Sequence, residues 1–165
     1  MNFDPDFRVT ERGDREIVLR RTFDAPPALV WRAWTEPLLV QRWMLGPPGW
    51  TMPVCEVDLR VGGAFRHVWR KDDGVEMAMT GVHLEIDPPH RIARTQRFEF
   101  GCEPGAEEHV GTVTFTAIDG GARTVAETVL VYASRAARDA ELRSGMEHGV
   151  RACYDRIDEL VVTLA

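Results

Sequence analysis

Residues 110–132 read VGTVTFTAIDGGARTVAETVLVY, and this stretch decides the fold class. Two strand-like segments, 110–118 and 123–132, flank Asp119-Gly120-Gly121. That tripeptide is typical of a turn, because glycine supplies positive φ and an aspartate side chain bonds its own backbone. Since a parallel crossover needs about a dozen residues or more, so short a connection predicts an antiparallel pair of strands.

The same pattern continues toward the N-terminus. Further strand-like segments are expected near residues 51–59, 64–70, 75–86 and 92–100, with turns at Gly62-Gly63, Asp72-Asp73-Gly74, Asp87-Pro88-Pro89 and residues 101–105. One earlier strand is predicted at residues 16–23, where Ile17 and Leu19 alternate with Val18 and Arg20. The sequence thus predicts six strands that pair antiparallel in sequence order, plus this first one.

Two short helices are predicted after the first strand. Asp24-Ala25-Pro26-Pro27 and Thr35-Glu36-Pro37 each place a capping residue before a proline, which is tolerated in the first turn of a helix. Apolar residues at helical spacing follow the first of these signals, so that Trp34 is expected to face a core.

A long helix is expected over residues 134–164. This segment has no proline, and Ser134 offers an N-cap. Its apolar residues lie mostly three or four apart, at Leu142, Met146, Val150, Cys153, Ile157, Leu160, Val161 and Leu164. One continuous helix of about 30 residues would be about 45 Å long and must lie along the sheet.

This order of elements predicts an α+β fold. The chain has 165 residues, of which 44% are hydrophobic, and it is long enough to form one complete core. We expect residues 14–165 to form a single domain and residues 1–13 to form a flexible N-terminal extension. A curved antiparallel sheet of six to seven strands, wrapped around the long helix, leaves a gap where the short helices hold helix and sheet apart.

Charge and cysteine content exclude several classes of partner. The 20 basic and 26 acidic side chains give a net charge of −6, and basic residues cluster only in pairs, which disfavours nucleic acid. Cys55, Cys102 and Cys153 lie far apart and indicate reduced thiols rather than a zinc site. No signal peptide and no apolar run of about 18 residues is found, so we expect a cytoplasmic protein without membrane insertion. No metal or cofactor is expected.

Motifs along nearly the whole chain resemble a known family. They are Phe23-Asp24-Ala25-Pro26, Val30-Trp31-Arg32-Ala33-Trp34-Thr35-Glu36-Pro37, Trp43, Gly46-Pro47, Asp58-Leu59-Arg60-Val61-Gly62-Gly63, Asp73-Gly74, Gly81, Glu85-Ile86-Asp87-Pro88-Pro89-His90-Arg91, Thr112-Val113-Thr114-Phe115, Arg138-Asp139, Gly145-Met146 and Asp155-Arg156-Ile157-Asp158-Glu159-Leu160. Together they resemble the START-like, helix-grip superfamily (SRPBCC), in the branch homologous to the activator of the ninety-kilodalton heat-shock protein ATPase.

The resemblance implies a helix-grip fold more than it implies a function. Members of the superfamily bind lipids, hormones, polyketides or partner proteins in or beside one groove, and this branch is mostly without an assigned activity. One departure is Arg42-Trp43-Met44-Leu45-Gly46-Pro47, because many relatives have two tryptophans directly before Gly-Pro. We therefore expect the rim of the pocket to differ.

Alternation along the strands predicts which side chains face the gap. The expected cavity wall consists of Phe65, His67, Trp69, Met77, Met79, His83, Phe98 and Phe100 from the strands, with Trp43, Met146 and Cys153 from the helices. A wall of methionine and aromatic residues suits a flat or apolar ligand. The alternative is that these side chains simply pack as a core.

The histidines on this face are the candidates for chemistry. His67 and His83 have a pKa near neutrality and would contact a ligand or transfer protons, unless they are core residues with satisfied hydrogen bonds. No Ser-His-Asp order, paired-carboxylate motif or H-E-x-x-H helix occurs, so no catalytic residue is assigned. His109 and His148 are expected to contact solvent, and His90 lies in a predicted turn.

Three charged or polar strand residues have partners that the sequence leaves open. They are Arg94, Gln96 and Glu127. Because a charge inside a pocket must be paired or change its protonation state, a buried Arg–Glu pair would anchor a polar group of a ligand.

Three functions remain open. The favoured one is binding of a small hydrophobic or aromatic ligand in the cavity. The second is a co-chaperone-like protein-interaction module of the heat-shock ATPase activator type. The third is an enzyme of the cyclase, dehydratase or hydrolase type that uses His67 or His83. A homodimer through an exposed strand, or through the loop between Trp43 and Trp50, is a further possible assembly.

Overall fold

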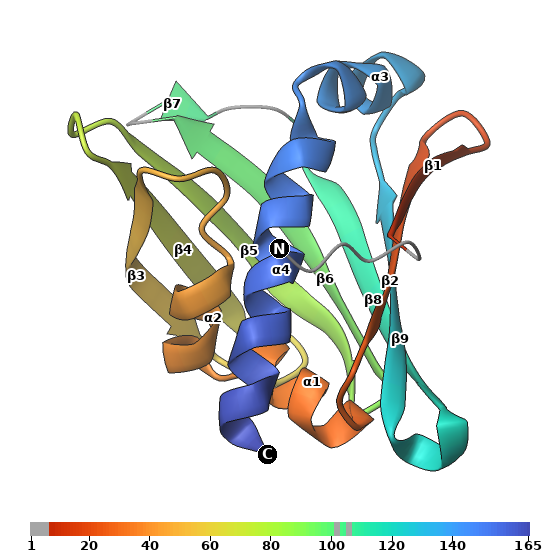
Figure 1. The fold of residues 1–165 in the computed structure, drawn as a ribbon. Coiled ribbons are helices and arrows are strands. Elements are labelled where there is room, and N and C mark those ends of the chain that lie inside the picture. Colours follow the sequence, from red (N-terminus) through yellow and green to blue (C-terminus); the bar gives the residue numbers. More distant parts are fainter. Residues whose placement is uncertain (1–6, 101–102, 105–106) are drawn as a thin grey trace.

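An antiparallel sheet curves around one long helix in this protein (Figure 1). The computed structural model describes residues 7–100, 103–104 and 107–165. The elements are β1 (Arg8–Arg12), β2 (Glu16–Phe23), α1 (Pro27–Thr35), α2 (Pro37–Trp43), β3 (Trp50–Val57), β4 (Ala64–Lys71), β5 (Glu76–Asp87), β6 (Arg91–Phe100), β7 (Glu103–Pro104), β8 (His109–Ile118), the 3-10 turn η1 (Asp119–Gly121), β9 (Arg123–Val131), α3 (Arg135–Arg143) and α4 (Met146–Leu164).

The sheet confirms the predicted α+β helix-grip class. Its strands follow the order β1-β2-β9-β8-β6-β5-β4-β3, and β7 pairs with β6 beside this path. Every pair is antiparallel. All seven expected strands are present, and β1 and β7 are two that the sequence did not predict. The short turns therefore did determine the pairing from β3 to β9.

The prediction of a flexible extension over residues 1–13 is wrong for residues 8–12, which form β1. Arg8–Arg12 pairs with β2 in a register that runs from Arg8 opposite Arg20 to Arg12 opposite Glu16. As an edge strand β1 exposes most of its side chains, so its sequence lacks apolar alternation. Residues 1–6 lie outside the described part of the chain.

Both short helices occur where the proline signals predicted them. Pro27 and Pro37 occupy the first turns of α1 and α2, but neither N-cap residue makes a side-chain capping bond. The Trp43 indole N–H donates to the carbonyl of Ala33 over 2.7 Å, which ties α2 to α1. The two helices thus form one unit at an end of the sheet (Figure 1).

The single C-terminal helix expected over residues 134–164 is in fact two helices. Ser134 caps α3 as predicted, because its Oγ accepts a hydrogen bond from the Ala137 amide over 3.1 Å. The break comes at Gly145, whose φ of 85° lies in the left-handed region that a side chain disfavours. Leu142 and Met146 still pack in one cluster across the break, so apolar spacing alone could not reveal it.

The apolar interior divides into three clusters. The largest joins α1, α2 and the C-terminal half of α4 to the sheet, with Phe23, Trp43, Tyr154, Ile157, Leu160 and Val161 among its members. A second cluster is centred on Met52, Phe65, Trp69 and Met79, and a third on Ile17, Leu19, Leu130 and Tyr132. Val150, in the N-terminal half of α4, packs against both the first and the third cluster.

A buried arginine fastens the sheet to α4. Arg21 on β2 has no solvent exposure, and its guanidinium donates to Asp155, over 2.8 Å, and to Asp158. Charge-assisted hydrogen bonds of this kind are roughly twice as strong as neutral ones. They fix the middle of α4 against the sheet.

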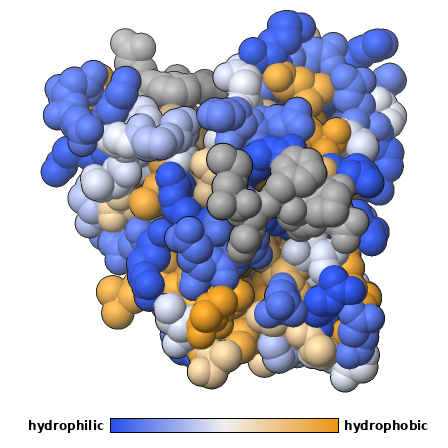
Figure 2. Space-filling view, viewed as in Figure 1, coloured by the Kyte–Doolittle hydropathy of each residue, from blue (hydrophilic) through white to orange (hydrophobic). Residues whose placement is uncertain are grey.

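Hydrophilic residues cover most of the face shown in Figure 2. Hydrophobic residues gather toward its lower part. Of the described large hydrophobic side chains, Leu38 on α2 and Val162 on α4 are among the most exposed, at 78% and 75%. Among the described residues, no helix has the length and apolar character required to cross a membrane.

Candidate functional site

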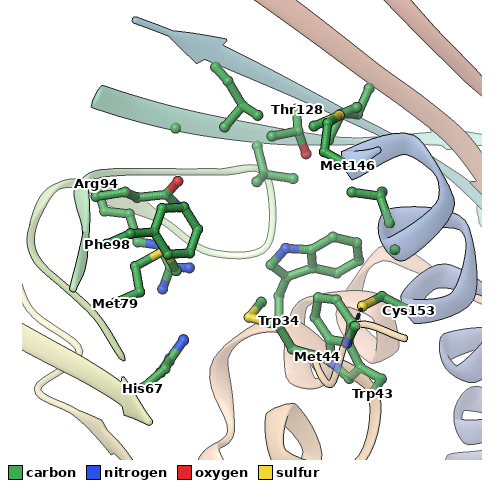
Figure 3. A pocket seen from close by; sticks show the side chains of 18 of the residues that line it. Trp34, Trp43, Met44, His67, Met79, Arg94, Phe98, Thr128, Met146 and Cys153 are labelled. Atoms are coloured by element: carbon green, nitrogen blue, oxygen red, sulfur yellow. Dashed lines mark hydrogen bonds between the residues drawn. The ribbon is translucent and has the colours of Figure 1, made fainter. Parts of the chain in front are cut away.

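A cavity of about 510 Å³ lies between the concave face of the sheet and the N-terminal half of α4 (Figure 3). Strands contribute Leu19, Trp50, Val57, His67, Trp69, Met77, Met79, His83, Ile92, Arg94, Gln96, Phe98, His109, Gly111, Val113, Thr128 and Leu130. Helices and connecting segments contribute Trp34, Thr35, Trp43, Met44, Leu45, Gly46, Pro47, Leu59, Tyr132, Glu141, Met146, Gly149, Val150, Cys153 and Tyr154.

Most side chains that the sequence assigned to the cavity wall meet there. They are Trp43, His67, Trp69, Met77, Met79, His83, Phe98, Met146 and Cys153. Phe65 does not line the cavity; it is 2% exposed and packs in the cluster of Met52 and Trp69. The assignment of Phe100 falls outside the side chains that the structure describes.

The segment between α2 and β3 closes one side of the cavity. The indole N–H of Trp69 donates to the Met44 carbonyl over 2.6 Å, and the Gly46 amide donates to Cys153 Sγ over 3.2 Å. These two bonds fasten the segment to β4 and α4. Met44 also lines the cavity, and its flexible side chain can adapt to the outline of a ligand.

Some lining residues were not assigned to the site from sequence. Trp34 was expected to face a core, and it does contact Phe115 and Tyr154, but it also borders the cavity. Thr128 and Leu130 line it from β9. Their spacing of two residues places both side chains on one face of the strand, but the sequence does not show which face of β9 is concave.

His67 is the most deeply buried polar side chain of the wall. It is 1% exposed, and neither ring nitrogen has a hydrogen-bond partner within the described part of the chain. Burial lowers the pKa of His67 well below its usual value, and the positive charge of Arg94 and then His83 lower it further. The ring is therefore neutral at pH 7 and presents one N–H donor and one acceptor.

His83 differs from His67 because its ring is anchored. Its Nδ1 lies 3.1 Å from the Gly63 carbonyl, so this nitrogen carries the proton and donates. Burial and then the charge of Arg94 lower its pKa. Two neutral imidazoles can accept protons from a ligand but are poor proton donors at pH 7.

The expectation that His109 contacts solvent is wrong. His109 begins β8 and is 5% exposed, with its ring stacked on Tyr132 at a centroid distance of 4.8 Å. Its Nε2 lies 2.9 Å from Gln96 Oε1. Polar neighbours in sequence suggested exposure, but the curve of the sheet turns this residue inward. His90 and His148 are exposed.

Arg94 is the cationic group of the cavity wall. It lies opposite His83 in the β5–β6 register, and its guanidinium carbon is 4.0 Å from the centre of the Phe65 ring. Within the described part of the chain no carboxylate forms an ion pair with it. Burial lowers the pKa of Arg94 to about 10, so it stays charged at pH 7.

The buried Arg–Glu anchor considered from sequence does not form with Glu127. Thr128 and Leu130 on the same strand line the cavity, so alternation places Glu127 on the opposite face of β9. Glu141 on α3 is the acidic residue of the wall, and it makes no ion pair with Arg94. Among the described residues, no group of three or more His, Cys, Asp or Glu side chains suits a metal ion.

Comparison with known proteins identifies relatives over almost the whole chain. The family model described as activator of Hsp90 ATPase homolog 1-like protein matches residues 24–162. A crystal structure from Rhodobacter sphaeroides is similar, with 27% sequence identity, a TM-score of 0.86, and coverage of 95% of this chain and 99% of that one. No curated protein matches the chain.

Two further crystal structures are comparable. One from Mycobacterium smegmatis has 27% identity and a TM-score of 0.78, and covers 93% of this chain and 96% of that one. One from Chromobacterium violaceum has 28% identity and a TM-score of 0.71, and covers 88% of this chain and 96% of that one.

Proposed function

The chain belongs to the family of activator of Hsp90 ATPase homolog 1-like proteins, and from this premise we propose that it binds a small hydrophobic or aromatic molecule in the cavity between the sheet and α4. The observation that carries the proposal is the cavity itself. Its volume of about 510 Å³ falls within the roughly 300–1,000 Å³ that ligand pockets usually have.

The chemistry of the wall supports an apolar occupant. Trp34, Trp69 and Phe98 offer flat surfaces, and Met77 and Met79 can adapt to an irregular outline. Apolar walls with a few polar groups are the usual composition of small-molecule sites.

A ligand panel with two matched variants tests the proposal. Met146 and Glu147 are neighbours on α4, but Met146 lines the cavity and Glu147 is exposed. A tryptophan at position 146 would extend into the ligand space, so Met146→Trp should abolish binding while Glu147→Trp retains it. Thermal shift with naphthalene derivatives and medium-chain lipids gives the readout.

The expected shift follows from mass action. A ligand at about 100 times its Kd stabilises the native state by about 2.7 kcal/mol. For a chain of this length that corresponds to a rise in Tm of about 5–10 °C. If no compound of the panel raises the Tm of the wild-type protein, or if Met146→Trp responds as Glu147→Trp does, the proposal is wrong.

A second candidate function comes from the family description. Relatives named for activation of the Hsp90 ATPase suggest that this chain binds a heat-shock ATPase of that class and raises its turnover. A coupled ATPase assay with and without the protein measures this directly. An unchanged rate at saturating protein would reject it.

A further inference from the structure

The cavity described above has an electrostatic asymmetry. At one end Arg94 and His67 reach it from β6 and β4, and at the other end Met146 and Cys153 border it from α4 (Figure 3). Figure 3 shows the guanidinium of Arg94 and the ring of His67 directed into the same space. The guanidinium and the imidazole therefore lie on the sheet side, whereas Met146, Val150 and Cys153 of α4 and the acidic Glu141 of α3 line the cavity from the helices.

Arg94 lacks the partner that a charge in this position needs. Removing a guanidinium from water is unfavourable unless an opposite charge and hydrogen bonds replace the lost hydration. The Phe65 ring makes a cation–π contact with one face of the guanidinium, with the guanidinium carbon 4.0 Å from the ring centre. Among the described residues no carboxylate pairs with it, and Glu141 lines the cavity without reaching it.

His67 is a second, independent sign of a missing polar partner. Nearly all buried polar side-chain atoms in proteins make a hydrogen bond, yet both nitrogens of this buried ring have none among the residues that the structure describes. Its neutral form has one N–H to donate beside the guanidinium. An oxyanion placed between the two side chains would satisfy both.

We propose that the natural occupant is an apolar carboxylate, whose anionic head is bound by the guanidinium of Arg94 and a ring N–H of His67 and whose apolar body extends toward α4. The inference rests on the proposed function and names the ligand class for the same cavity. A monoanion fits because Arg94 supplies the one cationic charge beside neutral imidazoles, and a planar carboxylate matches the fork of a guanidinium.

The decisive experiment compares each carboxylate with its neutral amide of the same shape. Isothermal titration would use naphthalene-2-carboxylate with naphthalene-2-carboxamide, and dodecanoate with dodecanamide. In the wild-type protein the carboxylates should bind about 10- to 100-fold more tightly than the amides, the range expected for a charge-assisted bond. This comparison needs no mutant.

Two variants on one strand locate the effect. Arg94→Met removes the charge inside the cavity, and Arg97→Met is its control because Arg97 is exposed on the opposite face of β6. Arg94→Met should bring the carboxylate-to-amide ratio close to one, whereas Arg97→Met should leave it unchanged. Because the charge of Arg94 is uncompensated, its loss should not lower the urea midpoint of the free protein.

The outcomes separate this inference from the proposed function. If carboxylates and amides bind the wild-type protein equally, or if only neutral compounds bind, the cavity binds ligands but the anion site is refuted. If no compound binds at all, the proposed function itself fails. A lower urea midpoint in Arg94→Met, combined with a carboxylate-to-amide ratio unchanged from the wild-type protein, would identify Arg94 as a structural residue and overturn the inference.

Discussion

The buried ring of His109 makes the stability of the fold depend on pH. Burial, and then the positive charge of Arg94, lower the pKa of His109 from 6.5 to about 4. The unfolded chain therefore takes up a proton on this residue at a higher pH than the native state does. Stability that is fully present above about pH 6.5 is lost progressively as the pH falls toward 4.

The size of this loss follows from the linkage relation. At about 1.4 kcal/mol for each pH unit, the full window between 6.5 and 4 corresponds to about 3 kcal/mol. Between about pH 8 and about pH 5 the loss is about 2 kcal/mol. This is a large part of the stability of a typical domain, about 5–15 kcal/mol.

Urea unfolding of His109→Gln tests the reasoning. The free energy of unfolding is measured for wild type and variant at about pH 8 and about pH 5. The free energy of unfolding of the wild-type protein minus that of His109→Gln should be about 2 kcal/mol smaller at the lower pH. The reason is that only the wild-type chain takes up a proton at position 109 when it unfolds. His148→Gln, which replaces an exposed histidine, is the matched control. An advantage of His109 that is equal at both pH values would refute the argument.

Three further predictions concern the scaffold and a thiol. Arg21→Met should lower the free energy of unfolding by about 3 kcal/mol in urea titrations, since it removes the buried guanidinium that Asp155 and Asp158 of α4 bind, whereas exposed Arg20→Met should change it by less than about 0.5 kcal/mol. Gly81→Ala should lower the free energy of unfolding by about 3 kcal/mol, measured by calorimetry, because the added Cβ would lie 1.8 Å from the Thr95 carbonyl oxygen. A melting temperature equal to that of the wild-type protein would contradict this. Burial raises the pKa of the Cys55 thiol from 9.0 to about 11, so its alkylation at about pH 8, followed by peptide mass spectrometry, should be about 100-fold slower in the native state than in urea. Equal rates in both states would contradict that burial.

The faces of the strands could be predicted from sequence because side chains alternate between the two faces along each regular stretch of strand. His67 and Trp69 on β4 and Met77 and Met79 on β5 do share the concave side. The same rule would have placed Arg94 there, since it is four residues from Phe98 on one strand. Sequence reasoning considered Arg94 only as half of an ion pair, so the unpaired charge went unnoticed.

Other features could not be predicted because they depend on contacts between distant segments. His109 stands among polar neighbours in the sequence, and pairing of β8 with β6 sets it opposite Gln96, whose Oε1 lies 2.9 Å from its Nε2. The break at Gly145 interrupts the helix at a point where apolar spacing continues. The register shift between His83 and Glu85 is likewise absent from any local pattern.

The division of α4 into a packed half and a hollow half has an evolutionary consequence. Ile157, Leu160 and Val161 pack in the solid core, whereas Met146 and Val150, in the first two turns of the helix, border the cavity. Selection for a different occupant can therefore act on the first part of the helix while selection for folding acts on the second. The ligand specificity of this fold can therefore change during evolution while every intermediate variant still folds.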